Sequence, residues 1–314
     1  MTLETNAFTT YLAVGNREDL SDVIYNVAAT ETPFLTGIAK VNASAVLHEW
    51  ETDSLASALT SNAVLEGDAI TNDAATATVR LSNTCQIQDK VPRVTGTQEV
   101  VKKAGRTSEM AYQVVKRTLE LRRDMETTVL NNQAENTGDA TTARKMGSVP
   151  SWIDTSDSNG GGAAATGSLG NTARTDGTQR TFTEALLKTV LQSIWNAGGE
   201  PDCITLGSFA KTLLSTFTGN ATRFKTAEDK KLVSSIDVYG SDWGDLEVIP
   251  NRFQRARDAF IFQKDMWAAA YLRPVSLANI GKTGDSQAKQ IIVEWTLEAR
   301  NEASSGAVWD LSTS

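Results

Sequence analysis

Residues 46–91 carry the pattern that most restricts how this chain can fold. Two segments, 46–51 and 77–87, alternate apolar and polar residues with the period of β-strands. The segment between them, 54–75, is mostly Ala, Ser, Thr, Asn and Asp and has no strong helical stripe. A single hairpin is marginally stable in water unless something covers its apolar face. Either the rest of the chain or another copy covers this arm, and the second alternative makes assembly the function of the protein.

The composition is that of a globular protein with an acidic surface. The chain has 314 residues, 40% of them hydrophobic, and a net charge of −8. This length allows one large domain or two ordinary ones. The acidic balance argues against a basic surface that holds phosphates, but it does not exclude a protein that encloses nucleic acid. We find no membrane-spanning apolar run and no secretory signal at the start. Cys85 and Cys203 are predicted to be reduced, packed thiols of a protein made in a cytosol.

The strongest helical signal lies between residues 107 and 133, which contain neither Pro nor Gly. Apolar residues recur there at helical spacing: Met110, Val114, Leu121, Met125 and Val129. At about 1.5 Å per residue this helix would be roughly 40 Å long, which marks it as a strut. Opposite charges four residues apart, as in Arg122 and Glu126, predict ion pairs along its surface. Before it, residues 1–45 are predicted to be irregular, with one short helix at 17–24 and a break at Thr32-Pro33.

The second half of the chain begins with a loop and continues as a compact α/β pattern. Residues 136–180 are rich in Gly, Ala and Ser, and they predict a long surface loop or a partly disordered insertion. From residue 183 onward the pattern predicts two helices, capped by Thr183 and Ser208 and ended near Gly198 and Gly219. Strands are predicted at 203–206, 233–239, 246–250, 259–262, 267–272 and 290–300.

The chain lacks a recognisable set of catalytic or metal-binding residues. His48 is the only histidine, and the sequence places no nucleophile or orienting partner beside it, so a structural role is predicted. One His and two distant Cys do not make a zinc site. Gly162 and Gly167 have the spacing of a phosphate loop, but Ser168 stands where the lysine belongs. The sequence therefore predicts no enzyme, no cofactor and no metal site.

Several local sequences, in their order along the chain, resemble a known family. They are residues 15–24 and 30–35, Leu47-His48-Glu49-Trp50, residues 182–199 and 243–253, and Glu294-Trp295-Thr296-Leu297-Glu298. Together with the order of arm, hairpin, strut helix and α/β unit, they are similar to the major capsid (major head) proteins of tailed phages, a family catalogued as a domain of unknown function. The resemblance spans nearly the whole chain and implies an α+β fold of the Hong Kong 97 type.

The resemblance also implies a division of the chain into domains. Residues 1–40 would be an N-terminal arm and 41–95 the extended hairpin called the E-loop. Residues 96–180 would belong to the peripheral domain, with its spine helix at 107–133 and the Gly/Ser-rich loop at 136–180. Residues 181–264 and 299–314 would form the axial domain, and 265–298 would return through the peripheral domain.

In function, the resemblance implies a structural virion protein whose pentamers and hexamers form an icosahedral shell around double-stranded DNA. It implies assembly in the host cytoplasm with a portal, a separate scaffolding protein and a decoration protein, without specific DNA binding or a membrane. The separate scaffold is expected because the arm motifs begin within the first twenty residues, unless this is a processed form. Candidate contacts between subunits are Leu47, Trp50, Val79, Leu81, Arg93, Trp243, Lys282 and Asp285, the last two as an ion pair and Trp243 either as an anchor or as a cap on its own turn.

Two alternatives remain open from the sequence. An encapsulin-type compartment would use the same fold to enclose enzyme cargo, and loaded shells from the native cell would favour it. A soluble hydrolase or binding module with an atypical site between residues 183 and 250 would instead be a monomer with a saturable small ligand.

Overall fold

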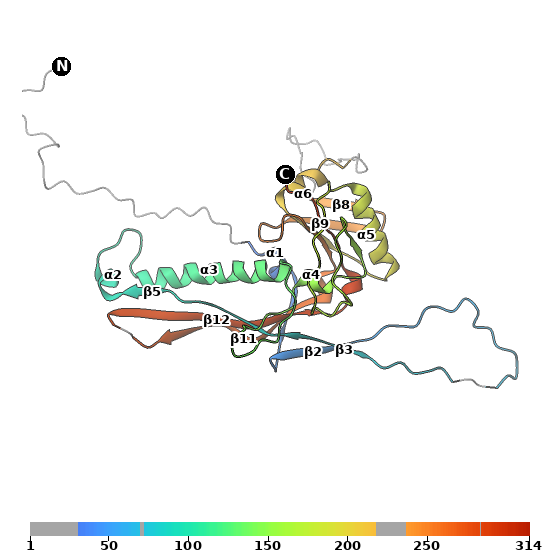
Figure 1. The fold of residues 1–314 in the computed structure, drawn as a ribbon, viewed down its shortest axis with the longest axis horizontal. Helices are drawn as coiled ribbons and strands as arrows, with labels where there is room; N and C mark the ends of the chain where they lie inside the picture. The colour runs from blue at the N-terminus through green and yellow to red at the C-terminus, as the bar shows by residue number, and fades with distance from the viewer. Residues whose placement is uncertain (1–30, 70–71, 218–236, 283) are drawn as a thin grey trace, which may run out of the picture.

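The computed structural model of the 314-residue chain describes residues 31–69, 72–217, 237–282 and 284–314. It shows an elongated subunit in which a long helix, α3, lies along a two-stranded ribbon formed by β11 and β12 (Figure 1). A compact unit of strands and helices stands at one end of α3. The β2–β3 hairpin extends in the direction opposite to the tip of the β11–β12 ribbon. The helix predicted at 17–24 lies outside the described residues.

A five-stranded sheet forms the layer under α3. Its strands are β1 (Ala39–Asn42), β11 (Trp267–Ile280), β12 (Ser286–Ala299) and β4 (Gln86–Lys90), in that order, with β5 (Arg93–Thr95) also paired to β12. The β1–β11 pair is parallel and the others are antiparallel. β11 and β12 are each 14 residues long, well beyond the predicted 267–272 and 290–300, because their outer halves pair with each other where the apolar pattern is weak.

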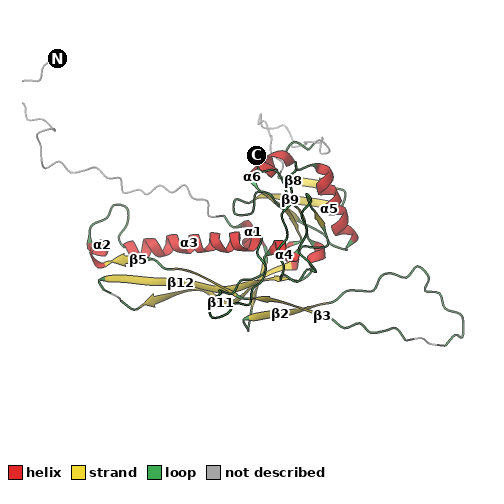
Figure 2. Ribbon diagram, in the orientation of Figure 1, coloured by secondary structure: helices red, strands yellow, loops and turns green. Residues whose placement is uncertain are grey.

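Helix α3 (Glu109–Leu130) begins and ends within the predicted range 107–133. Ser108 caps it by accepting a hydrogen bond from the Ala111 N–H. Met110, Leu121, Met125 and Val129 of the predicted stripe are buried, so the helix packs as its periodicity indicates. A short helix, α2 (Gly96–Val100), precedes it, and Figure 2 shows the red α3 running beside the yellow strands of the ribbon.

The compact unit is built on a six-stranded sheet in the order β6-β13-β10-β7-β9-β8. These strands are β6 (Asp157–Ser158), β13 (Gly306–Val308), β10 (Ala259–Phe262), β7 (Cys203–Leu206), β9 (Gly244–Pro250) and β8 (Val238–Ser241). Helices α5 (Glu184–Asn196) and α6 (Ser208–Leu214) pack on it, and single 3-10 turns lie at Lys264–Met266 and Glu302–Ser304.

The central strands of this sheet are buried on both faces, which joins the two layers into one body. In β10, Ala259 and Ile261 face the core under α5 and α6, whereas Phe260 and Phe262 face the core shared with α3 and the five-stranded sheet. This arrangement explains why β10 is a continuous apolar run and why all four residues of β7, including the polar Thr205, are buried. Both cysteines are free and buried, as predicted.

Local signals predicted several ends correctly and others wrongly. Thr183 caps α5 by accepting from the Leu186 N–H, as predicted, and Gly198, with φ +85°, follows its end. The predicted cap Ser208 is instead the first residue of α6, which Gly207 caps, and the predicted end at Gly219 lies outside the described residues. The break predicted at Thr32-Pro33 agrees with the structure, because Thr32 is non-helical and Pro33 begins a separate short helix, α1 (Pro33–Gly37), where its missing N–H costs nothing.

Residues 136–180 form a loop with a defined path, which agrees with the first predicted alternative, a long loop, and not with the second, a partly disordered insertion. It contains α4 (Val149–Trp152) with all four residues buried, as well as β6 and an isolated bridge between Ala163 and Thr175. A Cβ at Gly162 would clash with the Thr175 carbonyl oxygen. The glycines therefore allow two backbone segments to cross closely, and the loop packs through them.

Candidate functional site

The hairpin consists of β2 (Leu47–Thr52) and β3 (Val79–Thr84), and its base is fixed to its own chain. The Trp50 indole N–H donates to the Ala299 carbonyl at 2.9 Å, and its ring lies 5.5 Å from that of Trp152. Leu81 packs against the same core. Of the two alternatives for the cover of the arm, the rest of the chain therefore provides it at Trp50 and Leu81. Whether either also contacts a neighbour stays a prediction.

His48 lies beside Trp50 and is bound to a carboxylate. Its Nε2 lies 2.9 Å from Oε2 of Glu298, and Arg300 lies 2.8 Å from the other oxygen of Glu298. The hydrogen bond from His48 is the main reason that the pKa of Glu298 is below its ordinary value. His48 thus joins the base of the hairpin to the end of β12, which is the structural role that the sequence predicts.

A buried asparagine also holds the base of the hairpin in place. Asn83 is fully buried, and its amide N–H groups donate to the carbonyls of Gly147 and Leu297 at 3.1 and 2.8 Å. Its side-chain oxygen accepts from the Gly147 N–H at 2.8 Å. One side chain therefore connects β3, the loop 136–180 and β12. The alternating sequence pattern of β3 does not predict this role of Asn83.

Beyond the base, the arm has no cover. Every described residue from 53 to 80 is exposed, and none lies in a helix or strand until Val79. Large apolar side chains are among them, with Leu55 99%, Leu59 76%, Val64 83% and Leu65 80% exposed. We call this segment, residues 53–78, the arm tip. Its exposed apolar side chains make it a candidate contact surface.

The remaining predicted contact residues divide into three groups. Leu47 and Val79 are 43% and 58% exposed and lie on the outer side of the hairpin. Trp243 is half-buried against the core under α5 and α6, so its contacts within the subunit support the cap interpretation. The others are exposed: Arg93 on β5, and Lys282 and Asp285 in the turn between β11 and β12. The structure describes one subunit, so their contacts with neighbours stay predictions.

Glu126 is the largest departure from the sequence interpretation of α3. It is fully buried rather than paired with Arg122, and its two carboxylate oxygens accept from the N–H groups of Phe34 and Leu35, both at 2.9 Å. The Asn251 amide also donates to it, at 2.7 Å. Burial raises the pKa of Glu126, while these three donors favour its charged form. This residue clamps α1 and the segment after β9 to α3.

A second polar cluster holds the loop 136–180 to the C-terminal segment. Asp310, fully buried, accepts from Arg174 at 3.0 Å and from Arg257 at 2.8 Å. It also accepts from the backbone N–H groups of Gly160 and Gly177 at 3.0 and 2.9 Å. Burial opposes its ionisation, but these donors outweigh burial and lower its pKa. The cluster explains why this Gly-rich segment is ordered.

Asp258 lies in the same region but lacks such donors. Its side chain is fully buried, neither carboxylate oxygen accepts a hydrogen bond, and its nearest charge is Arg255 at 3.4 Å. Burial raises its pKa to about 6. It is the least compensated carboxylate of the cluster.

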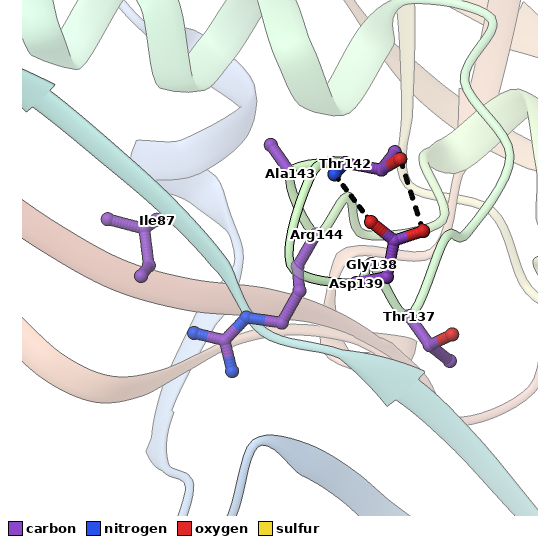
Figure 3. Close-up of a pocket in the computed structure, with 7 residues that line it drawn as sticks. All are labelled: Ile87, Thr137, Gly138, Asp139, Thr142, Ala143 and Arg144. Carbon is purple, nitrogen blue, oxygen red and sulfur yellow. Dashed lines mark hydrogen bonds between the residues drawn. The ribbon is translucent and has the colours of Figure 1, made fainter.

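The hollow in Figure 3 does not have the arrangement of a catalytic site. It has a volume of about 430 Å³ and is lined by Ile87 and residues 137–139 and 142–144. The Asp139 carboxylate turns back onto its own loop, where Thr142 donates to it through backbone and side chain. Arg144 binds Glu294 at 2.7 Å. The two charged side chains of the lining, Asp139 and Arg144, are thus engaged with their own loop and with the sheet.

The described residues contain no group of three or more His, Cys, Asp or Glu side chains that could hold a metal ion. In the same part of the chain, no helix combines the length and apolar character needed to cross a membrane.

Comparisons with known proteins agree with this architecture. The family model described as SU10 major capsid protein matches residues 3–312. The major capsid protein of Escherichia phage Phieco32 is 26% identical over 96% of both chains. The capsid asymmetric unit of cyanophage A-1(L) has a TM-score of 0.70 at 14% identity, covering 98% of this chain and 99% of that one. A phage G structure of major capsid and decoration proteins has a TM-score of 0.54 at 11% identity, covering 99% and 100%.

These matches confirm the predicted family and the α+β fold of phage capsid proteins, and they favour a capsid subunit over the encapsulin and hydrolase alternatives. The match to the family model covers almost every residue, including the hairpin and both larger sheets. The chain therefore belongs to the SU10 major capsid protein family and is a structural subunit of a phage capsid shell.

Proposed function

We propose that copies of this subunit form pentamers and hexamers that close into an icosahedral shell around double-stranded DNA, and that the arm tip is a principal contact between copies. The observation that carries this proposal is the exposure of Leu55, Leu59, Val64 and Leu65 on a segment whose base is locked. Burying such side chains gains roughly 1.5–3 kcal/mol each, which gives the segment a strong preference for a partner. A shell supplies that partner at every position.

Five further predicted residues fit contacts between copies. Leu47 and Val79 would extend the apolar contact from the arm tip toward its base. Lys282 and Asp285, exposed at the far tip of the ribbon, would pair between neighbouring copies, and Arg93 on the adjacent β5 would join them. An exposed ion pair contributes little alone, about 0–1 kcal/mol, but a closed shell repeats it many times.

The acidic balance of the chain suits a container for DNA. With a net charge of −8, the subunit repels a phosphate backbone on average, so packaged DNA remains free to enter and leave. We infer that the protein encloses DNA without specific binding and has no catalytic activity of its own. We also propose assembly in the host cytoplasm with a portal and a scaffolding protein. The decoration proteins in the phage G structure support a similar partner here.

Electron microscopy of the purified protein tests the proposal. Closed shells with pentameric and hexameric units are the expected result. A protein that stays monomeric at high concentration, with its arm resistant to protease, would contradict both the shell and the role of the arm.

A matched pair of variants isolates the arm tip. Replacing Leu55, Leu59, Val64 and Leu65 by Ser should abolish shell formation. The free energy of unfolding of the isolated subunit should change by less than about 0.5 kcal/mol, because exposed sites contribute little to folding. Leu169→Ser, at another exposed leucine (46%) outside the arm, should leave assembly intact. Equal assembly of both variants would show that the arm tip is not a contact.

A further inference from the structure

Arg255 lies between two carboxylates whose surroundings differ. Its Nη2 donates to Oδ2 of Asp176 at 2.5 Å, whereas its Nε lies 3.4 Å from Oδ2 of Asp258. The Asp176 side chain is 36% exposed, and it also binds Arg174 at 2.5 Å and Arg257 at 3.2 Å. The Asp258 side chain is fully buried, and neither of its oxygens accepts a hydrogen bond from the described residues. Arg255 therefore binds the more exposed carboxylate and leaves the buried one without a donor.

The ion pair between Arg255 and Asp176 connects the loop 136–180 to the segment that follows β9. Asp176 belongs to the loop, and Arg255 lies five residues beyond the last residue of β9. The residue after Asp176, Gly177, donates its N–H to the Asp310 carboxylate at 2.9 Å. A change in the position of Asp176 is therefore passed directly to a backbone hydrogen bond that holds the loop.

We propose that ionisation of Asp258 transfers Arg255 from Asp176 to Asp258. The loop 136–180 is then held tightly while Asp258 is neutral and more loosely once Asp258 is charged. This pH-sensitive contact belongs to the single subunit, so it acts whether or not a shell has formed.

The charges that face Asp258 come from three segments of the chain. They are Arg174 and Asp176 of the loop, Arg255 and Arg257 of the segment after β9, and Asp310 of the C-terminal segment. With Asp258 neutral, three guanidinium groups face two carboxylates, and each of these carboxylates has more than one cationic partner. Once ionised, Asp258 is a third carboxylate in a position shielded from water, where an unpaired charge is most costly. The guanidinium group nearest to it, that of Arg255, is the one it attracts.

The orientation of Arg255 makes the two contacts exclusive. The Nε–H and one N–H of Nη2 point the same way from the planar guanidinium group, and a carboxylate binds this edge through both of its oxygens. Nη2 is the atom that now binds Asp176, and Nε is the atom nearest to Asp258. A strong charge-assisted hydrogen bond is about 2.7–2.9 Å long, so a shift of about 0.5 Å is enough for Asp258 to take this edge. Asp176 keeps Arg174 and Arg257 after the exchange, so the loop loosens without unfolding.

Among these carboxylates, Asp258 is the one that titrates in the mildly acidic range. Burial raises its pKa to about 6, and Arg255 is the strongest of the charges that oppose this shift. The folded chain therefore keeps this proton at pH 5 and releases it by pH 7.5. Asp176 and Asp310 have pKa values below the ordinary one despite partial burial, because their donors favour the charged form. Both stay charged over this range.

Hydrogen exchange of the full-length subunit at pH 5 and pH 7.5 tests the exchange of partners. The reporters are the hydrogen-bonded amides of the loop, namely those of Gly160, Ala163, Thr175, Gly177 and Thr178. After correction for intrinsic exchange rates, their protection in the native chain should be lower at pH 7.5 by about threefold or more, as expected for the loss of one partly exposed ion pair. Asp258→Asn has nearly the same shape but cannot ionise, so its protection should be the same at both pH values.

Two further variants separate this effect from a general response to pH. Asp245→Asn removes an exposed carboxylate of β9 outside the cluster, and it should respond to pH as the native chain does. Asp176→Asn weakens the contact with Arg255 directly, so it should already show at pH 5 the lower protection that the native chain reaches at pH 7.5. Circular dichroism checks that each variant is folded. Equal protection of the native chain at both pH values, the same pH response in Asp258→Asn, or native protection of Asp176→Asn at pH 5 would each overturn the proposal.

Discussion

Replacing Glu126 tests whether one buried carboxylate joins the arm to the body of the subunit. Glu126 accepts from three buried donors, the N–H groups of Phe34 and Leu35 and the Asn251 amide. Each buried donor left without an acceptor costs about 1–3 kcal/mol. Removing the carboxylate also removes its own cost of burial, which offsets part of the loss. We therefore expect Glu126→Ala to lower the free energy of unfolding by about 4 kcal/mol, and Glu126→Gln, which keeps one acceptor oxygen, to lower it by about 2 kcal/mol.

Urea denaturation of dissociated subunits measures these losses, and hydrogen exchange at the Phe34 and Leu35 amides localises them. Both amides should exchange much faster in Glu126→Ala, while the centre of β10 stays protected. The matched control is Glu120→Gln on the same helix, whose carboxylate is partly exposed and pairs with Arg117. It should cost less than about 1 kcal/mol. A loss below about 1 kcal/mol for Glu126→Ala, or equal losses for the two sites, would refute the clamp.

Three further outcomes follow from the packing. Because burial raises the pKa of Asp258 from 3.8 to about 6, the folded state holds this proton more tightly than the unfolded state does. The stability of the native chain relative to Asp258→Asn should therefore fall by up to about 3 kcal/mol as the pH rises from 4 to 6.5, and a constant difference in urea titrations would contradict this. Trp50→Ala should destabilise the isolated subunit by about 3–5 kcal/mol, whereas Val79→Ser should leave it nearly unchanged; equal losses on thermal unfolding would show that Trp50 is not part of the core. Cys85 and Cys203 should resist a thiol reagent at pH 8 until urea unfolds the chain, because burial raises the pKa of both thiols, that of Cys85 to about 11, and rapid labelling of the folded protein would be the contrary result.

Local rules were sufficient wherever the determining groups are close in sequence. The Thr183 cap and the short buried strand β7 were predicted correctly, because the cap bond spans three residues and β7 depends on only four consecutive residues. The long hairpin was predicted for the same reason. Its second strand was placed as one element, although the chain leaves β3 at Cys85 and enters the five-stranded sheet as β4.

The buried polar contacts of the candidate site could not be predicted, because the residues that form them are distant in sequence. The spacing of Arg122 and Glu126 predicts a surface pair worth a few tenths of a kcal/mol. Three buried donors from elsewhere outweigh that pair, and all three come from residues more than ninety positions away. Arg174 and Asp310 are separated by 136 residues, and the Gly-rich sequence between 159 and 167 suggests disorder until the second partner is placed. Strand alternation predicted that His48 and Trp50 share a face, but only tertiary structure shows that their own chain covers it.

The division of the hairpin into a locked base and a bare tip has a consequence for assembly. If the whole arm were uncovered, a neighbour would have to order its backbone on binding, at about 1–2 kcal/mol per residue. Trp50, His48 and Asn83 already fix the direction and register of the base in the free subunit, so that ordering is complete before contact. Only the tip remains to be ordered, and its exposed leucines provide the gain on burial. Because the base of the hairpin is fixed, the leucines of the tip sample a restricted volume. This restriction raises the affinity for a neighbour without adding any contact. Loosening the base, for example by His48→Ala, should therefore weaken assembly although His48 lies far from the tip.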